Sequence, residues 1–193
     1  MVAASAIAAL RWEPHACDLR EASRLPPWLV TERLAARILL RRLAGEVVGG
    51  EAAASPLAAR AEGQPYLVTR PDVGISLSHT DGWVAAAVRP GGAVGIDAQV
   101  PVPVEDRLLR RCCSPSALAE LGWLPGPVRE LEFAWIWSVQ EACVKATGAG
   151  VKGRPWTIRV EVGQRGGRWR GVRWRALRDA WPIPVSCAQC PGG

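Results

Sequence analysis

The chain has 193 residues, of which 49% are hydrophobic, and this is enough to build one larger domain or two small ones without disulfides or metal staples. No apolar run approaches the roughly 18 residues that a membrane span needs, and the opening MVAASAIAAL lacks a basic start and a cleavage site, so we expect a cytoplasmic protein. The net charge of +6 lies wholly at the C-terminal end: residues 151–193 carry nine basic and two acidic residues (+7), against 15 basic and 16 acidic residues (−1) before them.

The N-terminal part predicts a strand and then a long amphipathic helix. Residues 3–12 are mostly apolar and are followed by Pro14, which favours a first, buried strand. Pro26 and Pro27 precede a run with helical periodicity that we expect to end near Gly45. The residues expected to face the core are Leu34, Ile38, Leu39 and Leu43.

A stripe of arginines follows the same helix. Arg33, Arg37 and Arg41 are spaced by four residues, so they share one helix face. A solvated face is the ordinary interpretation of such a stripe.

The middle of the chain predicts short strands joined by tight turns. Residues 49–61 are small and loop-like, with room for one helical turn. Ser78 and His79 come at the end of one predicted strand. The expected strands are residues 74–78, 83–88 and 93–98, with a turn at 71–72 and a hairpin turn at 90–92.

The last of these strands carries a carboxylate and an amide on one face. Apolar residues alternate with Gly95, Asp97 and Gln99, a period of two that predicts a half-buried strand. Asp97 and Gln99 then point the same way. The ordinary interpretation is an exposed aspartate at a strand end.

Two short helices, at residues 106–111 and 114–121, with Ser114 or Ser116 as a cap, lead to a central helix over residues 132–147 that ends at Gly148. Spacing of four puts Trp137, Glu141 and Lys145 on one stripe of this helix. A surface ion pair between Glu141 and Lys145 is the ordinary interpretation. Lysine is scarce, however, because Lys145 and Lys152 are the only two among 24 basic residues.

If the central helix packs on the aspartate strand, the sequence brings oxygen ligands together. Asp97 and Glu141 would supply two carboxylates, with Gln99 as a neutral third ligand. Magnesium suits such a set, because it usually binds one or two carboxylates together with substrate phosphates and water.

The C-terminal part predicts three more strands, at residues 157–162, 168–177 and 182–188. The first two alternate basic residues with apolar or aromatic ones, as in a sheet that a helix covers on one face. The predicted fold class is therefore α+β, with two similar halves that each pack a small, mostly antiparallel sheet on a long helix. We expect the halves to be residues 1–92 and 93–193. No partner subunit is needed to complete such a site, so we expect a monomer.

The six cysteines show no complete zinc pattern. Cys187 and Cys190 form one CxxC, but no second pair follows and the histidines are not spaced to complete a site. We expect reduced cysteines that pack as small apolar residues.

Three motifs occur in an order that resembles a known family. They are ISLSHTDGWVAAAV at residues 75–88, GID at residues 95–97 and WSVQEACVK at residues 137–145, with GQPYL before them at residues 63–67. Together they resemble the phosphopantetheinyl transferases, specifically the two-half, surfactin-type branch.

The resemblance implies an activity and a site. Members of the family transfer the phosphopantetheine arm of coenzyme A to a serine of an acyl, peptidyl or aryl carrier protein, as in polyketide or nonribosomal peptide biosynthesis, and release adenosine 3′,5′-bisphosphate. It implies that Asp97 and Glu141 hold Mg²⁺ and that Lys145 with His79 neutralises the diphosphate. Glu141 or a metal-bound water would take the serine proton. The resemblance also implies that Ser78, Arg33 and Arg37 contact coenzyme A, with the two arginines on the 3′-phosphate.

The chain also departs from the family pattern at three positions. Gln99 stands where a second acid is common, Gln140 stands where a lysine is typical, and Ala117 stands where a glutamate is frequent, with Glu120 one turn on. These losses motivate an alternative: a weakened homologue that binds coenzyme A or a carrier protein without efficient transfer. A different class, a nucleic-acid-binding module built on the basic, tryptophan-rich C-terminal part, is less favoured because no nucleic-acid motif accompanies it.

Overall fold

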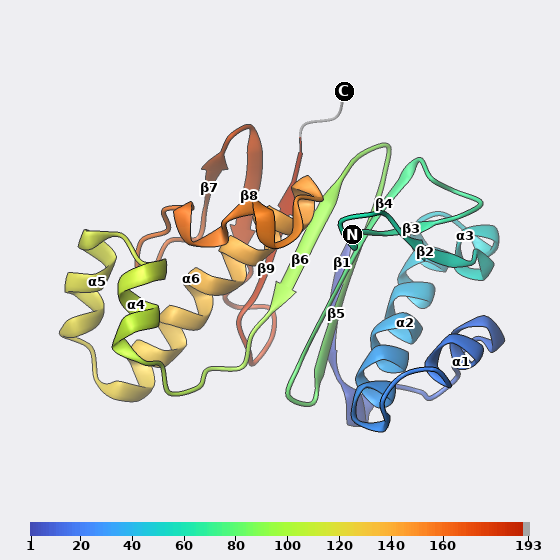
Figure 1. The fold of residues 1–193 in the computed structure, drawn as a ribbon, viewed down its shortest axis with the longest axis horizontal. Helices are drawn as coiled ribbons and strands as arrows, with labels where there is room; N and C mark the ends of the chain where they lie inside the picture. The colour runs from blue at the N-terminus through green and yellow to red at the C-terminus, as the bar shows by residue number, and fades with distance from the viewer. Residues whose placement is uncertain (191–193) are drawn as a thin grey trace.

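The structure is a computed structural model that describes residues 1–190. Two sheets lie back to back, and each is covered on its outer face by one long helix, α2 or α6 (Figure 1). The first sheet has the order β1-β5-β4 and the second the order β6-β9-β8-β7, and all pairings are antiparallel. The predicted fold class is confirmed. The sheet strands are β1 (Val2–Ala6), β4 (Val73–Thr80), β5 (Trp83–Pro90), β6 (Val94–Ala98), β7 (Gly166–Trp169), β8 (Val172–Ala176) and β9 (Val185–Gln189).

The helices and smaller elements fill the ends of the two sheets. The α-helices are α1 (Ala16–Ala22), α2 (Pro27–Val47), α3 (Gly50–Ala54), α4 (Asp106–Cys112), α5 (Pro115–Gly122) and α6 (Gly126–Thr147). Strands β2 (Leu57–Ala59) and β3 (Pro65–Leu67) form a separate two-stranded sheet. Short 3₁₀ helices occur at η1 (Ile7–Ala9), η2 (Gly150–Gly153) and η3 (Pro155–Thr157). No helix among residues 1–190 is both long and apolar enough to span a bilayer.

The two faces of strand β5 pack into two different hydrophobic cores. Val84, Ala86 and Val88 pack against α2, and the alternate residues Ala85 and Ala87 pack against the second sheet. This follows from the period of two, which turns successive side chains to opposite faces. The four inward residues predicted for α2 are all buried, as the amphipathic pattern indicated.

Helix α6 lies directly on β6, and Gly95 makes this close packing possible. A Cβ at Gly95 would lie 2.0 Å from the carbonyl oxygen of Ala142, so only glycine allows so close an approach. The helix ends at Gly148, whose φ of 69° is left-handed, as the sequence predicted. Its first residue, Gly126, precedes the expected start at 132.

A ladder of hydroxyl groups joins the two halves. Ser76, Ser78 and Thr80 of β4 accept hydrogen bonds from the main-chain N–H groups of Ile96, Ala98 and Val100, at 3.0, 3.2 and 3.3 Å. These side chains replace the backbone pairing that would otherwise satisfy the edge of β6. The ladder fixes the place of the Asp97 strand beside the end of β4.

Four predictions about strands were wrong. Residues 3–12 do not form one buried strand, because β1 ends at Ala6, is only partly buried and is followed by the 3₁₀ helix η1. Residues 83–98 do not form a hairpin, because β6 pairs with β9 of the other sheet. Residues 157–162 form no strand; Ile158 and Val160 are buried against α6 without a ladder partner. Residues 168–177 form two strands, β7 and β8, joined by Arg170 and Gly171, which both have positive φ.

Candidate active site

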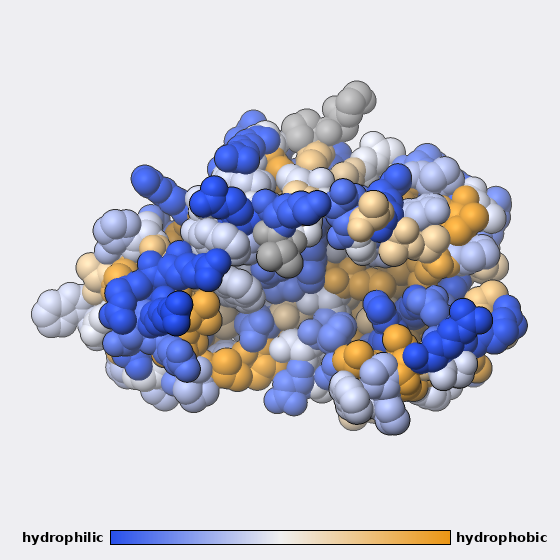
Figure 2. Space-filling view, viewed as in Figure 1, coloured by the Kyte–Doolittle hydropathy of each residue, from blue (hydrophilic) through white to orange (hydrophobic). Residues whose placement is uncertain are grey.

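A cavity of about 570 Å³ opens between the two halves of the molecule. The space-filling view is hollowed at this place, between the part that contains α6 and the part that contains α2 (Figure 2). Its walls come from α2, residues 57–65, the end of β4, Asp97 of β6 and the end of α6. Five predicted site residues besides Asp97 line it: Arg33, Arg37, Ser78, His79 and Lys145.

Asp97 lies at the base of this cavity and is 6% exposed. Its Oδ1 accepts hydrogen bonds from Lys145 Nζ at 2.7 Å and from Ser78 Oγ at 2.8 Å. Lys145 also donates to the carbonyl oxygen of Leu77 at 3.2 Å. The lysine therefore pairs with the strand aspartate, and among residues 1–190 it makes no ion pair with Glu141, the partner that helical spacing suggested.

Glu141 is a half-buried carboxylate close to this pair. Burial raises the pKa of Glu141, the negative charge of Asp97 raises it further, and Lys145 partly offsets both. Such a carboxylate is a better proton acceptor than a free glutamate, because its conjugate acid is weaker.

His79 contacts an acidic residue that is not among the predicted site residues. Its Nδ1 lies 2.9 Å from Oε2 of Glu32, one helix residue before Arg33. This contact leaves Nε2 of the imidazole available to a ligand in the cavity. No sequence signal connects Glu32 with His79, because they come from different elements.

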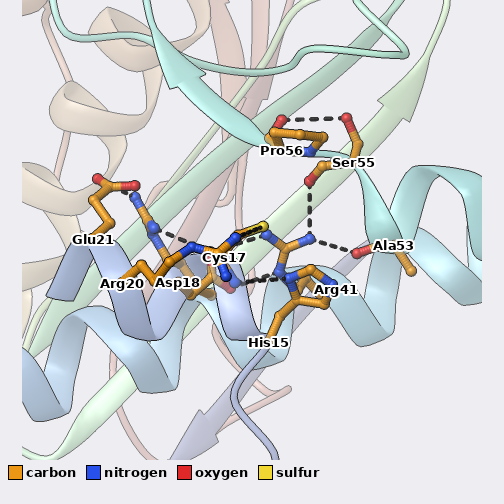
Figure 3. Close-up of polar contacts among 10 residues, drawn as sticks. His15, Cys17, Asp18, Arg20, Glu21, Arg41, Ala53, Ser55 and Pro56 are labelled. Carbon is orange, nitrogen blue, oxygen red and sulfur yellow. Dashed lines mark hydrogen bonds and ion pairs between the residues drawn. The ribbon is translucent and has the colours of Figure 1, made fainter. Parts of the chain in front are cut away.

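The two arginines of α2 have different surroundings. Arg33 is exposed, whereas Arg37 is 6% exposed and donates to Asp18 at 3.0 Å and to Glu21 at 2.6 Å. Arg41, one turn on, makes two more bonds to Asp18 and two to the carbonyl oxygens of Ala53 and Ser55 (Figure 3). The solvated-face interpretation of the arginine stripe is wrong for Arg37 and Arg41.

The positions that depart from the family pattern lie outside the cavity. Gln99 lines a neighbouring groove with Phe133 and Trp137, and its side chain donates to the carbonyl oxygen of Val100 at 3.0 Å. Gln140 is fully buried and donates to the carbonyl oxygens of Cys112 and Ile158, and Ala117 is a core residue of α5. Gln140 thus fills a structural position in the core.

The carboxylates near the cavity are the type of ligand that magnesium binds. Asp97 and Glu141 lie close enough for the charge of Asp97 to raise the pKa of Glu141, although Asp97 lines the cavity and Glu141 does not. Among the described residues no group of three or more His, Cys, Asp or Glu side chains could hold a metal ion. Two carboxylates are sufficient for magnesium when phosphates and water complete the shell.

The six cysteines are all free.

Comparison with known proteins agrees with this geometry. The sequence model of the 4′-phosphopantetheinyl transferase superfamily matches residues 93–181, a segment that contains Asp97, Glu141 and Lys145. This segment is therefore similar to the phosphopantetheinyl transferase superfamily. It comprises β6, α4 to α6, β7 and β8, so the match covers most of the second half of the fold.

Curated phosphopantetheinyl transferases are similar over parts of the chain. An L-aminoadipate-semialdehyde dehydrogenase-phosphopantetheinyl transferase of Eremothecium gossypii is 40% identical over 99 residues, which cover 47% of this chain and 36% of the relative. A 4′-phosphopantetheinyl transferase of Bacillus subtilis is 26% identical over 114 residues, covering 59% and 50%. One of Bacillus pumilus is 33% identical over 89 residues, covering 46% and 38%. The chain thus spans between about a third and a half of the curated relatives that it matches.

Proposed function

We propose that this protein is a phosphopantetheinyl transferase of the two-half, surfactin-type branch. It would transfer the phosphopantetheine arm of coenzyme A to a serine of an acyl, peptidyl or aryl carrier protein, the reaction of a holo-[acyl-carrier-protein] synthase, and release adenosine 3′,5′-bisphosphate. One observation carries the proposal: Asp97, Lys145 and His79, which come from three elements and both halves, line one cavity.

The side chains around the cavity suit a diphosphate. The Lys145 ammonium and the His79 imidazole would donate to the phosphoryl oxygens, where charge builds up as the leaving group departs. Arg33 would reach the 3′-phosphate from the rim. Arg37 is already paired with Asp18 and Glu21. It would therefore act on the ligand indirectly, by holding these two carboxylates in place and through its positive charge.

Glu141 would take the proton of the carrier serine. Its raised pKa supports this role, because a base acts most efficiently when its pKa approaches the working pH. Asp97 and Glu141 would hold magnesium, which when bound supplies charge neutralisation at the diphosphate. Gln99 would be a neutral third ligand only if its side chain turned away from the neighbouring groove that it lines. Ser78 would orient Asp97 through the hydrogen bond at 2.8 Å.

A carrier-protein assay tests the proposal. The protein is incubated with magnesium, coenzyme A and a panel of apo carrier proteins, and each carrier is weighed by mass spectrometry. An increase by the mass of the phosphopantetheine arm supports the transferase. Coenzyme A binding without any increase would instead support the weakened homologue, which Gln99 in place of an acid favours. We expect a cytoplasmic monomer, which sedimentation and fractionation would check.

A further inference from the structure

A second cavity, of about 500 Å³, lies between the two sheets, outside the candidate active site. It opens on the face of the second sheet that is turned away from α6. Its charged side chains are all arginines: Arg89 of β5, Arg168 of β7, and Arg173 and Arg175 of β8. No acidic residue lines it.

The strand register brings three of these arginines together. Arg168 and Arg173 lie directly opposite each other on β7 and β8. Arg175 projects from the same face two residues further along. Like charges directly opposite in a sheet destabilise it, and none of the three makes an ion pair within residues 1–190. The sheet therefore tolerates a repulsion that an anion would relieve.

Arg89 approaches the same cavity from the other half and is held rigidly. Its Nη1 donates to the carbonyl oxygen of Ala93 at 3.1 Å and to that of Cys190. A guanidinium that is already fixed loses little conformational entropy when it binds a ligand. An anion here would thus contact both halves of the molecule.

From this arrangement we propose that the cavity between the sheets binds a compact, multivalent anion of the phosphate class. Guanidinium groups match phosphate oxygens in a bidentate geometry, and such charge-assisted bonds are strong. A nucleic acid is a poorer fit, since single-stranded bases need exposed aromatic faces to stack on. Trp174, the aromatic residue of this wall, is 3% exposed and packs under α6.

Cys187 provides a local reporter. It lies opposite Arg175 on β9, lines the cavity and is partly exposed. Burial raises the pKa of its thiol and Arg175 lowers it, which is consistent with the two groups being neighbours. A ligand in the cavity would cover this thiol.

The experiment measures the rate at which iodoacetamide alkylates Cys187, followed by peptide mass spectrometry, with inorganic diphosphate as the probe. At about ten times its dissociation constant, diphosphate should slow the reaction about tenfold, in proportion to the unoccupied fraction. Cys17, far away on α1, is the internal control and should react at an unchanged rate.

Variants assign the effect to the arginines. Arg173→Gln with Arg175→Gln should weaken the protection at least about tenfold, as expected for two lost charge-assisted bonds. Two control variants should leave the protection of Cys187 unchanged. They are Arg165→Gln, at an exposed arginine paired with Asp179, and Lys145→Ala, in the first cavity. Unchanged reactivity of Cys187 with diphosphate would overturn the proposal, as would equal protection in the double variant. Protection by a single-stranded oligonucleotide but not by diphosphate would also overturn it, in favour of nucleic acid.

Discussion

Lys145 Nζ and Asp97 Oδ1 lie 2.7 Å apart, although the two residues are separated by 48 positions in the chain. The lysine comes from the last turn of α6 and the aspartate from the strand that this helix covers. Ser78 of the other half donates to the same oxygen. Helix, strand and the opposite half therefore meet at one carboxylate oxygen, at the base of the candidate active site.

Asp18 should be critical for stability. It is 2% exposed and pairs with both Arg37 and Arg41, so Asp18→Asn leaves the buried guanidinium of Arg41 without a counter-charge and that of Arg37 with Glu21 alone. Breaking a buried pair in this way costs about 3 kcal/mol, which urea unfolding would measure. Glu13→Gln is the matched control, because its pair with Arg11 is exposed and should contribute less than about 1 kcal/mol. Equal costs for the two variants would show that the network is not a stability element.

Glu141 should oppose stability at neutral pH. Its pKa is raised in the folded state, so folding favours the protonated form: its stabilising contribution is present below the unfolded pKa and is lost as the pH rises through the folded pKa. Glu141→Gln should therefore raise the free energy of unfolding near pH 7 but change it little near about pH 4, while transfer is lost. Thermal melts at the two pH values check this. If Glu141→Gln is instead less stable than the natural protein near pH 7, the buried charge of Glu141 does not destabilise the folded state.

Glu132 should link stability to pH in the opposite sense. Burial raises the pKa of Glu132, but two hydrogen bonds from Arg178 at 2.7 Å and one from the N–H of Gly163 outweigh it, and the net pKa is lowered. Its contribution is present above the model-compound pKa of 4.5 and is lost as the pH falls through the folded pKa. Glu132→Gln should cost about 1–3 kcal/mol at neutral pH, and the difference should shrink in acid. A difference that is constant over this range would contradict the prediction.

Gln99→Glu tests the extent of the metal shell. If Gln99 is the neutral third ligand, the added charge should tighten magnesium binding by about tenfold, as titration calorimetry would show. Gln140→Glu is no suitable control, because Gln140 is buried in the core; the exposed Gln189→Glu on the second sheet is preferable. Unchanged affinity in Gln99→Glu would place Gln99 outside the metal shell.

Local signals predicted much of the fold. Gly148 ended the central helix because a left-handed residue is needed there, and alternation on β8 predicted which residues α6 covers. Residues 157–162 alternate in the same way, but burial of Ile158 and Val160 requires no strand partner. Pro127, in the first turn of α6, is a helix-start signal that lies before the expected start at residue 132.

The sequence motifs predicted several residues of the candidate site, but not which side chains pair with each other. The spacing of Glu141 and Lys145 suggested a pair, yet the lysine binds Asp97 because the strand lies directly beneath the helix. Likewise, the burial of Arg37 depends on Asp18 of α1, and no local pattern connects the two. Pairings between distant elements depend on tertiary packing, which spacing along the chain does not encode.

The most direct test of the central claim is the mass of an apo carrier protein after incubation with coenzyme A, magnesium and either the natural protein or Asp97→Asn. Asparagine keeps the shape and one oxygen for Ser78 but removes the charge opposite Lys145. We predict that the natural protein adds the phosphopantetheine arm and that Asp97→Asn does so at least about 100-fold more slowly, while Asp179→Asn, on the surface, is unaffected. Equal rates for the natural protein and Asp97→Asn would contradict the account.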